Sequence, residues 1–187
     1  MRLKIFIITV LLSGLNLISE AQPRSIQFDH LSVDDGLPHT TVTCIIQDHL
    51  GFMWFGTLNG LCRYDGYNIK IFLNDPEDST SISNNQVWTI FEDSYNRLWV
   101  GTRGGGINLY NPEKDVFTCY KHDPNDKNSR PFDIIRTITQ DHSGRIWIGT
   151  YKGVCWYDTE KDRFNRLSDE LGISDDEQGS IYSFSED

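Results

Sequence analysis

A seven-residue pattern that ends in Gln or Glu followed by Asp occurs four times in this 187-residue chain, at intervals of 45, 48 and 46 residues. The four copies are 42–48, 87–93, 135–141 and 181–187. Repeats of about 40 to 50 residues are typical of propeller blades and of helical-pair solenoids. The period therefore restricts the chain to a repeat architecture, and the residues inside each repeat decide which one.

Short apolar runs fill each repeat. They are four to six residues long, rich in Val, Ile, Phe and Trp, and separated by Gly or by Asn and Asp at turns. Paired helices would instead show apolar spacings of three and four across ten or more residues. The second repeat predicts four strands, at 87–92, 97–102, 106–110 and 117–120, and the other repeats match it. We predict an all-β fold of four-stranded β-propeller blades.

The number of repeats predicts three complete blades plus the first strand of a fourth, in an incomplete, open propeller. Propellers have about four to eight blades, commonly seven. The chain is therefore interpreted as the N-terminal portion of a longer product or as a truncated reading frame. The predicted boundaries are a signal peptide at 1–21 and an entry segment at 22–41 that leads into the first strand. The three blades follow at 42–86, 87–134 and 135–180, and a fourth repeat starts at 181–187.

One Trp and one Gly, two residues apart, stand on the same strand in every complete repeat. Residues two apart in a strand point to the same face, so the Gly leaves room beside the Trp for a neighbouring sheet. We expect them to form the core between blades, rather than a row of sugar-stacking rings. These blade-core residues are Trp54, Gly56, Trp99, Gly101, Trp147 and Gly149.

The first 21 residues have the pattern of a secretory signal peptide: Arg2 and Lys4, an apolar stretch over 5–18, and small residues before the expected cut after Ala21. An uncleaved membrane anchor is the alternative, although the stretch is shorter than the ~20 residues of a spanning helix. The mature protein should begin at Gln22. This pattern predicts export.

Charge and cysteine content exclude several other roles. The formal charge of −10, without any basic run, argues against capture of nucleic acid or of an anionic membrane. Cys62 and Cys155 occupy equivalent repeat positions and are expected to be small buried strand residues. The four cysteines have no zinc-type spacing, and no metal site, cofactor or structural disulfide is expected.

The order of motifs resembles the two-component regulator propeller repeat: Asp, turn, aliphatic-Trp-aliphatic-Gly-Thr, Gly, aliphatic, Tyr-Asp. The segment 28–38 resembles the start of such arrays. The resemblance covers residues 26–187. It implies the periplasmic sensor end of a Bacteroides-type hybrid two-component system, which senses oligosaccharides to control transcription of glycan-use genes. It also implies a chain that continues through an inner-membrane helix to a histidine kinase, a receiver and a DNA-binding domain, and a homodimer when full length.

No nucleophile, base and orienting acid form a recognisable arrangement, so we predict no catalytic residue and no enzyme activity for these residues. A propeller enzyme, an exported lyase or hydrolase, is the alternative. The Asp that ends each repeated pattern is expected to stabilise a turn. Trp88 and Trp156 do not recur and are freer to serve a ligand.

The loops between strands four and one and between strands two and three share one rim of a blade array. Amide, guanidinium and phenol groups there suit sugar hydroxyls or carboxylates, and an oligosaccharide would bind together with blades outside this chain. Ordinary polar loops are the competing interpretation. The candidate ligand-binding residues are His39, Asn59, Asn84, Asn85, Arg103, Arg130, Tyr151 and Lys152.

Overall fold

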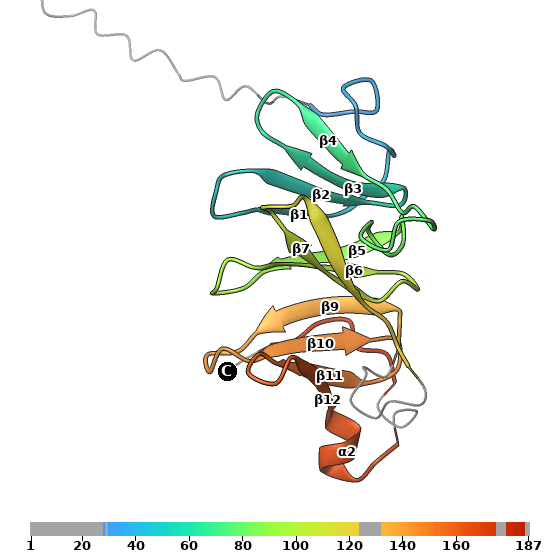
Figure 1. Ribbon diagram of the computed structural model, residues 1–187, viewed down its shortest axis with the longest axis vertical. Coiled ribbons are helices and arrows are strands. Elements are labelled where there is room, and N and C mark those ends of the chain that lie inside the picture. Colours follow the sequence, from blue (N-terminus) through green and yellow to red (C-terminus); the bar gives the residue numbers. More distant parts are fainter. Residues whose placement is uncertain (1–27, 29, 124–131, 175–178, 186–187) are drawn as a thin grey trace, which may run out of the picture. The chain divides into compact units, whose positions relative to one another are not determined.

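The computed structural model describes residues 28, 30–123, 132–174 and 179–185 (Figure 1). The chain divides into two units, 1–30 and 31–187, and the blades lie in the second. Among the described residues, no helix has both the length and the apolar character to cross a membrane.

Three antiparallel four-stranded sheets make up the second unit, each with its strands in sequence order. The first sheet contains β1 (Val42–Gln47), β2 (Met53–Thr57), β3 (Gly60–Tyr64) and β4 (Ile69–Phe72). The second contains β5 (Val87–Glu92), β6 (Leu98–Thr102), β7 (Ile107–Asn111) and β8 (Val116–Tyr120). The third contains β9 (Ile135–Gln140), β10 (Ile146–Thr150), β11 (Val154–Asp158) and β12 (Arg163–Arg166). The predicted all-β fold of three blades in an open array is confirmed.

Two features differ from the sequence prediction. A short helix, α2 (Leu167–Leu171), follows β12 and ends at Gly172 in the left-handed conformation. Residues 181–185, predicted as the first strand of a fourth blade, form no regular strand. Ile181 nevertheless donates its amide to the Thr150 carbonyl at 3.0 Å. A strand needs a ladder of such bonds with a neighbouring strand, and the described residues 181–185 are not assigned to one.

An Asp at the start of each β-hairpin turn organises that turn. In the third blade, Oδ1 of Asp141 accepts the amides of Ser143 and Arg145, and Oδ2 accepts the indole N–H of Trp147 at 2.7 Å. Burial tends to raise the pKa of Asp141, but these hydrogen bonds outweigh it and lower the pKa to about 2. Asp48 and Asp93 bond their own turns and indoles in the same way. The predicted turn role is confirmed, and each Asp also anchors its blade's Trp.

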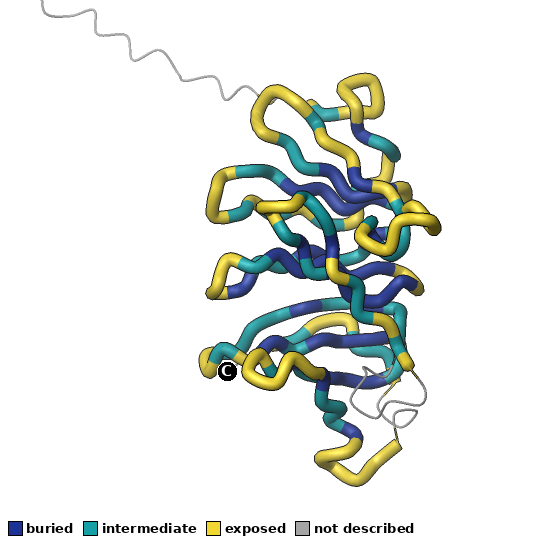
Figure 2. The backbone as a smooth tube through the Cα atoms, viewed as in Figure 1, coloured by how far each residue is buried: buried dark blue, intermediate teal, exposed yellow. Residues whose placement is uncertain are grey.

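The core lies between successive sheets, and Figure 2 shows that the buried stretches of the backbone lie along the strands of these sheets. Trp54 packs edge-on against Tyr110 of the next blade with ring centres 5.1 Å apart, and Trp99 packs against Tyr157 at 4.9 Å. Both indoles are 1% exposed. The equivalent Trp147, on the last sheet, is only half-buried. The Trp row is therefore inter-blade core wherever another sheet covers it.

The Gly two residues after each Trp allows the next blade to approach closely. A Cβ on Gly101 would lie 2.6 Å from Cγ2 of Ile135 on the following first strand. Gly56 has the same relation to Val87, and Gly149 to Ile181, at 2.7 and 2.8 Å. Ile181 thus occupies the place of a next first strand, and each of these glycines lies where a side chain would meet the segment that follows.

Candidate functional site

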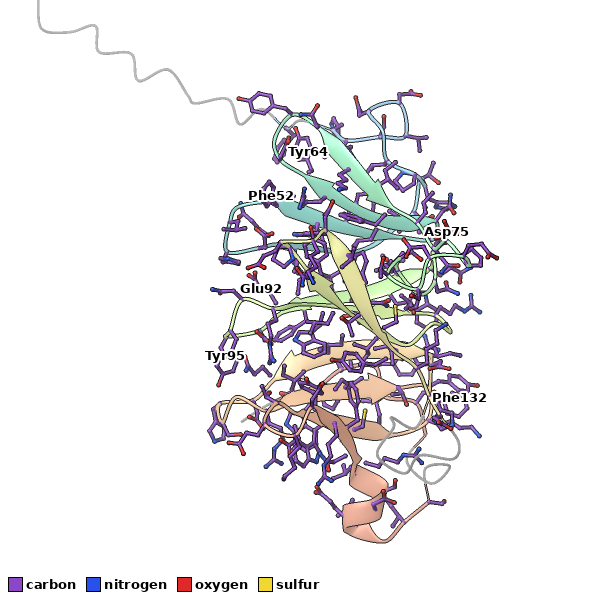
Figure 3. The ribbon with its side chains drawn as sticks, viewed as in Figure 1. Phe52, Tyr64, Asp75, Glu92, Tyr95 and Phe132 are labelled. Atoms are coloured by element: carbon purple, nitrogen blue, oxygen red, sulfur yellow. The ribbon has the colours of Figure 1, made fainter. Side chains whose placement is uncertain are left out.

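The sheets approach one another most closely at their first strands. β1 contacts β5 and β5 contacts β9, while the fourth strands make no comparable contact with one another. The first strands therefore form the inner side of the array. Figure 3 shows Asp75 and Phe132, from loops between strands four and one, at one edge of the sheets, and Glu92 and Tyr95 at the opposite edge.

Backbone hydrogen bonds join the two kinds of loop along the first of these edges, here called the rim. The Gly60 amide donates to the Asn85 carbonyl at 2.7 Å, Arg103 to Gln86 at 2.9 Å, and Tyr151 to Ile134 at 3.0 Å. The Gly60 bond links the loop between strands two and three of the first blade to the residues before the first strand of the next blade, and the Gly106 amide does the same from the second blade, to the Asp133 carbonyl at 2.9 Å. The Arg103 and Tyr151 bonds link such a loop to the residue before the first strand of its own blade. The rim is thus a continuous band of loops.

A β-bulge lies at the rim end of each first strand. The pairing of β5 with β6 shifts between Val87 and Thr89, so Trp88 has no partner across the ladder. The same shift leaves out Thr43 in β1 and Arg136 in β9. A bulge breaks the regular alternation of a strand and redirects the side chain it carries. The second residue of every first strand is therefore set apart from its sheet.

Two arginines and three aromatic rings meet around these bulges. The guanidinium carbon of Arg136 lies 4.2 Å from the ring centre of Trp88, 4.8 Å from Tyr182 and 5.8 Å from Tyr151. That of Arg103 lies 5.3 Å from the Trp88 ring. Cations over aromatic faces at such distances attract the ring quadrupole. We call these five residues the bulge cluster.

The bulge cluster includes Arg103 and Tyr151 from the predicted rim residues. Lys152 lies beside it, with its ammonium 5.3 Å from the ring of Phe132, which is 6.2 Å from Tyr151. Arg130 lies outside the described residues.

The other four candidates bond to backbone groups of their own loop or of an adjacent segment. His39 Nδ1 accepts the amide of Thr41 at 2.9 Å. The side-chain oxygens of Asn84 and Asn85 accept the amides of Gln86 and Asn74 at 2.8 and 2.7 Å. Asn59 is exposed, and its side chain reaches the Pro38 carbonyl at 3.5 Å. These bonds are loop-forming, and the structure does not bring the four residues into the bulge cluster.

Sequence reasoning missed Arg136, Tyr182 and Phe132 as site residues. The candidates predicted from the sequence lie in loops, whereas Arg136 and Tyr182 occupy the second position of the repeated seven-residue pattern. That position reads Thr43, Trp88, Arg136 and Tyr182 along the chain, while its neighbours keep an apolar or small character. This variation inside a regular repeat was the available signal.

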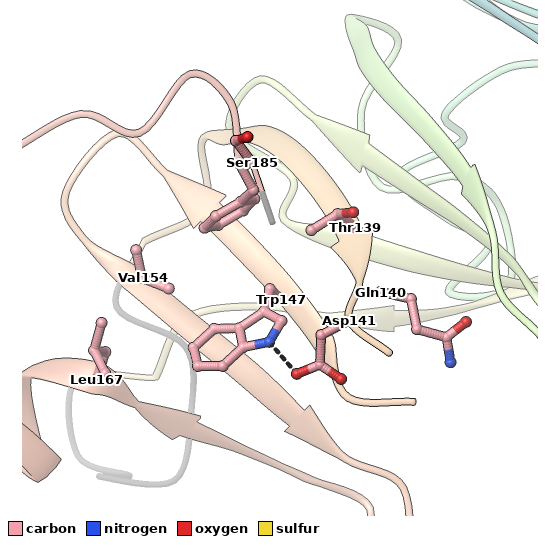
Figure 4. Close-up of a pocket in the computed structure, with 8 residues that line it drawn as sticks. Thr139, Gln140, Asp141, Trp147, Val154, Leu167 and Ser185 are labelled. Atoms are coloured by element: carbon pink, nitrogen blue, oxygen red, sulfur yellow. Dashed lines mark hydrogen bonds between the residues drawn. The ribbon is translucent and has the colours of Figure 1, made fainter. Parts of the chain in front are cut away.

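A pocket of about 410 Å³ lies on the outward face of the third sheet (Figure 4). Trp147 and its Asp141 partner form part of its wall. In the first two blades the corresponding indole is covered by a Tyr of the next sheet. The pocket is therefore the uncovered counterpart of an inter-blade core. The residues that line it are Thr139, Gln140, Asp141, Trp147, Val154, Leu167, Phe184 and Ser185.

Sheets of this topology, packed through first strands and Trp–Gly pairs, define the class as an open array of β-propeller blades. Three segments, 36–59, 81–104 and 129–152, match the family "Two component regulator propeller". The three matched segments follow one another along the three blades, and the resemblance drawn from the sequence is confirmed.

Known proteins agree with this assignment. The chain is 26% identical, with a TM-score of 0.74, to a crystal structure described as the extracellular domain of hybrid two component system BT3049 from B. thetaiotaomicron; the match covers 83% of this chain and 22% of that one. Over 74 residues it is 43% identical to "Histidine kinase P4" of Formosa agariphila, which is 40% of this chain and 5% of that protein. A virginiamycin B lyase from Staphylococcus aureus is 17% identical with a TM-score of 0.51, over 71% of this chain and 42% of the lyase, and shows the fold alone.

Proposed function

We propose that this chain supplies part of the exported, periplasmic ligand-sensing propeller of a hybrid two-component sensor. In that role it recognises an oligosaccharide, and binding controls transcription of genes for glycan use. The observation that carries the proposal is the set of three propeller repeats whose blades match the extracellular domain of a hybrid two component system over 83% of this chain.

The chemistry of the rim supports binding. Sugar-binding sites combine aromatic faces with a few polar groups that fix orientation. The bulge cluster offers three rings and two guanidinium groups, and Tyr182 and Tyr151 are 68% and 44% exposed. Within the described residues, no group of three or more His, Cys, Asp or Glu side chains is placed to hold a metal ion.

The matches cover 22% of the extracellular-domain structure and 5% of the histidine kinase. We therefore propose the kinase step for the complete sensor protein and not for these residues. Histidine kinase activity, the phosphorelay and the DNA-binding output would reside in other parts of the sensor protein. These blades would contribute ligand recognition, and two copies of the full sensor would form a homodimer.

Deletion of the gene in its host tests the proposal. Growth on a panel of purified glycans, followed by transcript sequencing, should show one glycan whose induction of a gene cluster is lost in the deletion strain and restored by complementation. Unchanged induction on every glycan would contradict the proposal. In parallel, incubation of the purified protein with the same glycans tests the enzyme alternative, which predicts shortened or unsaturated products.

A further inference from the structure

We infer that the bulge cluster binds the carboxylate or sulfate group of an acidic saccharide, with Arg136 and Arg103 as the anion-binding residues. The inference rests on the proposed function, because it names the ligand class of the sensor. It assigns a binding role to the redirected side chains of the first strands.

The bulge itself does not require Trp or Arg. In the first blade, the hydroxyl of Thr43 at this position donates to the carbonyls of Gly56 and Val87, at 2.9 and 2.6 Å, and so ties two blades together. Trp88 and Arg136 make no such bond within the described ranges. The β-bulge therefore places a residue that stabilises the contact between two blades in the first blade, and larger side chains of different chemistry in the next two.

Arg136 has hydrogen-bonding capacity that the described residues do not use. Its Nε–H is shielded from solvent, and within the part of the chain that the structure describes it has no acceptor and Arg136 forms no ion pair with a carboxylate. Buried donors are normally paired, so an unpaired one calls for an explanation. Stacking on Trp88 covers the flat face of the guanidinium and leaves its in-plane donors to meet an anion.

Arg103 adds a second positive charge beside the same indole. Both guanidinium carbons lie within 5.3 Å of the Trp88 ring centre, and the side-chain bond from Arg103 to the neutral Gln86 is long, at 3.4 Å. A bound anion stabilises two cations that lie against the same ring, neither of them paired with a carboxylate among the described residues. In a chain of formal charge −10, this pair is a local exception.

The exposed aromatic rings favour a saccharide as the carrier of that anion. Tyr182 contacts Arg136 and is 68% exposed, and Tyr151 is 44% exposed. A pyranose can lay its C–H face on such a ring while its acid group reaches the arginine. A long polyanion without stacking groups would be repelled by the rest of this acidic chain.

The test is calorimetric titration of the 187-residue chain with matched probes. These are trigalacturonate, its methyl ester, a neutral galactose trisaccharide and a sulfated galactose trisaccharide. The ester keeps the sugar rings and removes the charge. We expect at least one of the two acidic probes to bind at least tenfold more tightly than the ester and the neutral sugar. A preference between trigalacturonate and the sulfated probe identifies the acid group.

Arg136→Gln should weaken binding of the acidic probe at least tenfold. Arg136→Lys keeps the positive charge but lacks the paired N–H donors of the guanidinium, so it should give a smaller loss. Arg145→Gln is the matched control. Arg145 is exposed and stacks 4.5 Å from the Trp156 ring, on the first-to-second-strand turn, so the variant removes the same charge and the same kind of ring contact away from the rim. Far-ultraviolet circular dichroism checks that each variant is folded.

The inference would be overturned if neither acidic probe bound more tightly than the ester and the neutral sugar, or if Arg136→Gln and Arg145→Gln had equal effects. Binding of neutral sugars alone would also overturn it and leave the proposed sensing function standing. Tight binding of an acidic probe, combined with an unchanged transcript profile in the deletion strain, would support the inference and contradict the proposed sensing function.

Discussion

Replacement of Trp99 by Ala should destabilise the array more than the same change at Trp147. Trp99 is 1% exposed, and its ring centre lies 4.9 Å from that of Tyr157 on the next blade. Removal of a buried Trp side chain costs about 3–5 kcal/mol, because the surrounding atoms only partly collapse into the cavity. The carboxylate of Asp93 keeps its 2.6 Å bond to Arg97 after the indole is lost. The loss of the indole N–H therefore adds little to the free-energy cost of the substitution. We expect a loss of about 4 kcal/mol.

Trp147 provides the internal control, since it occupies the same repeat position and bonds its own Asp at 2.7 Å. It differs in that none of the three sheets described covers its outer face, and it is half-buried. Because the transfer and cavity costs scale with the area and contacts removed, Trp147→Ala should cost about half as much, roughly 2 kcal/mol.

Urea unfolding followed by far-ultraviolet circular dichroism measures both changes without relying on the mutated fluorophore. The m-value should stay constant if each variant unfolds in two states. A loss below about 1 kcal/mol for Trp99→Ala, or equal losses for the two variants, would refute the reasoning that the neighbouring blade supplies the core.

Three further predictions concern the scaffold and its processing. Gly101→Ala should cost about 1–3 kcal/mol in the same urea assay, because the new Cβ would lie 2.6 Å from Cγ2 of Ile135 on the next blade; a neutral effect would mean that the two blades can move apart without loss. Since hydrogen bonds lower the pKa of Asp141 from 3.8 to about 2, the stability its carboxylate contributes is complete above pH ~4 and is lost as the pH falls toward 2. Asp141→Asn should therefore flatten the pH dependence of unfolding in that window, and an unchanged slope would count against the turn bonds. Signal peptidase should cut between Ala21 and Gln22, so N-terminal sequencing of exported protein that began at Met1 would contradict the leader assignment.

Much of the fold could be predicted from the sequence because its determinants are local. Predicted strands at 97–102 and 106–110 match β6 (Leu98–Thr102) and β7 (Ile107–Asn111) within one residue. Apolar alternation and an Asp at each turn act over a few residues, and the repeat shows the same pattern several times. Helix α2 was not foreseen, because five residues are too few to carry a helical period.

The candidate site was predicted only in part. Arg103 and Tyr151 were identified because loop residues at a rim are natural ligand groups. Asn84 and Asn85 were chosen on the same ground, yet their side chains close their own loops. Residue type at a loop position does not reveal whether a polar atom is already satisfied, since that depends on where the next segment of backbone passes.

The sequence by itself determined the blade, its period and the Trp, Gly and Asp positions that build it, because each of these depends on neighbours along the strand or turn. Only the tertiary structure decided that Trp88 and Arg136, separated by 48 positions, would meet at 4.2 Å. Their contact requires one blade to be stacked on the next and a one-residue shift in two separate ladders. The physical reason is that a repeat specifies its own hydrogen bonds, whereas the contacts between variable positions of different repeats exist only after packing has set the distance between sheets.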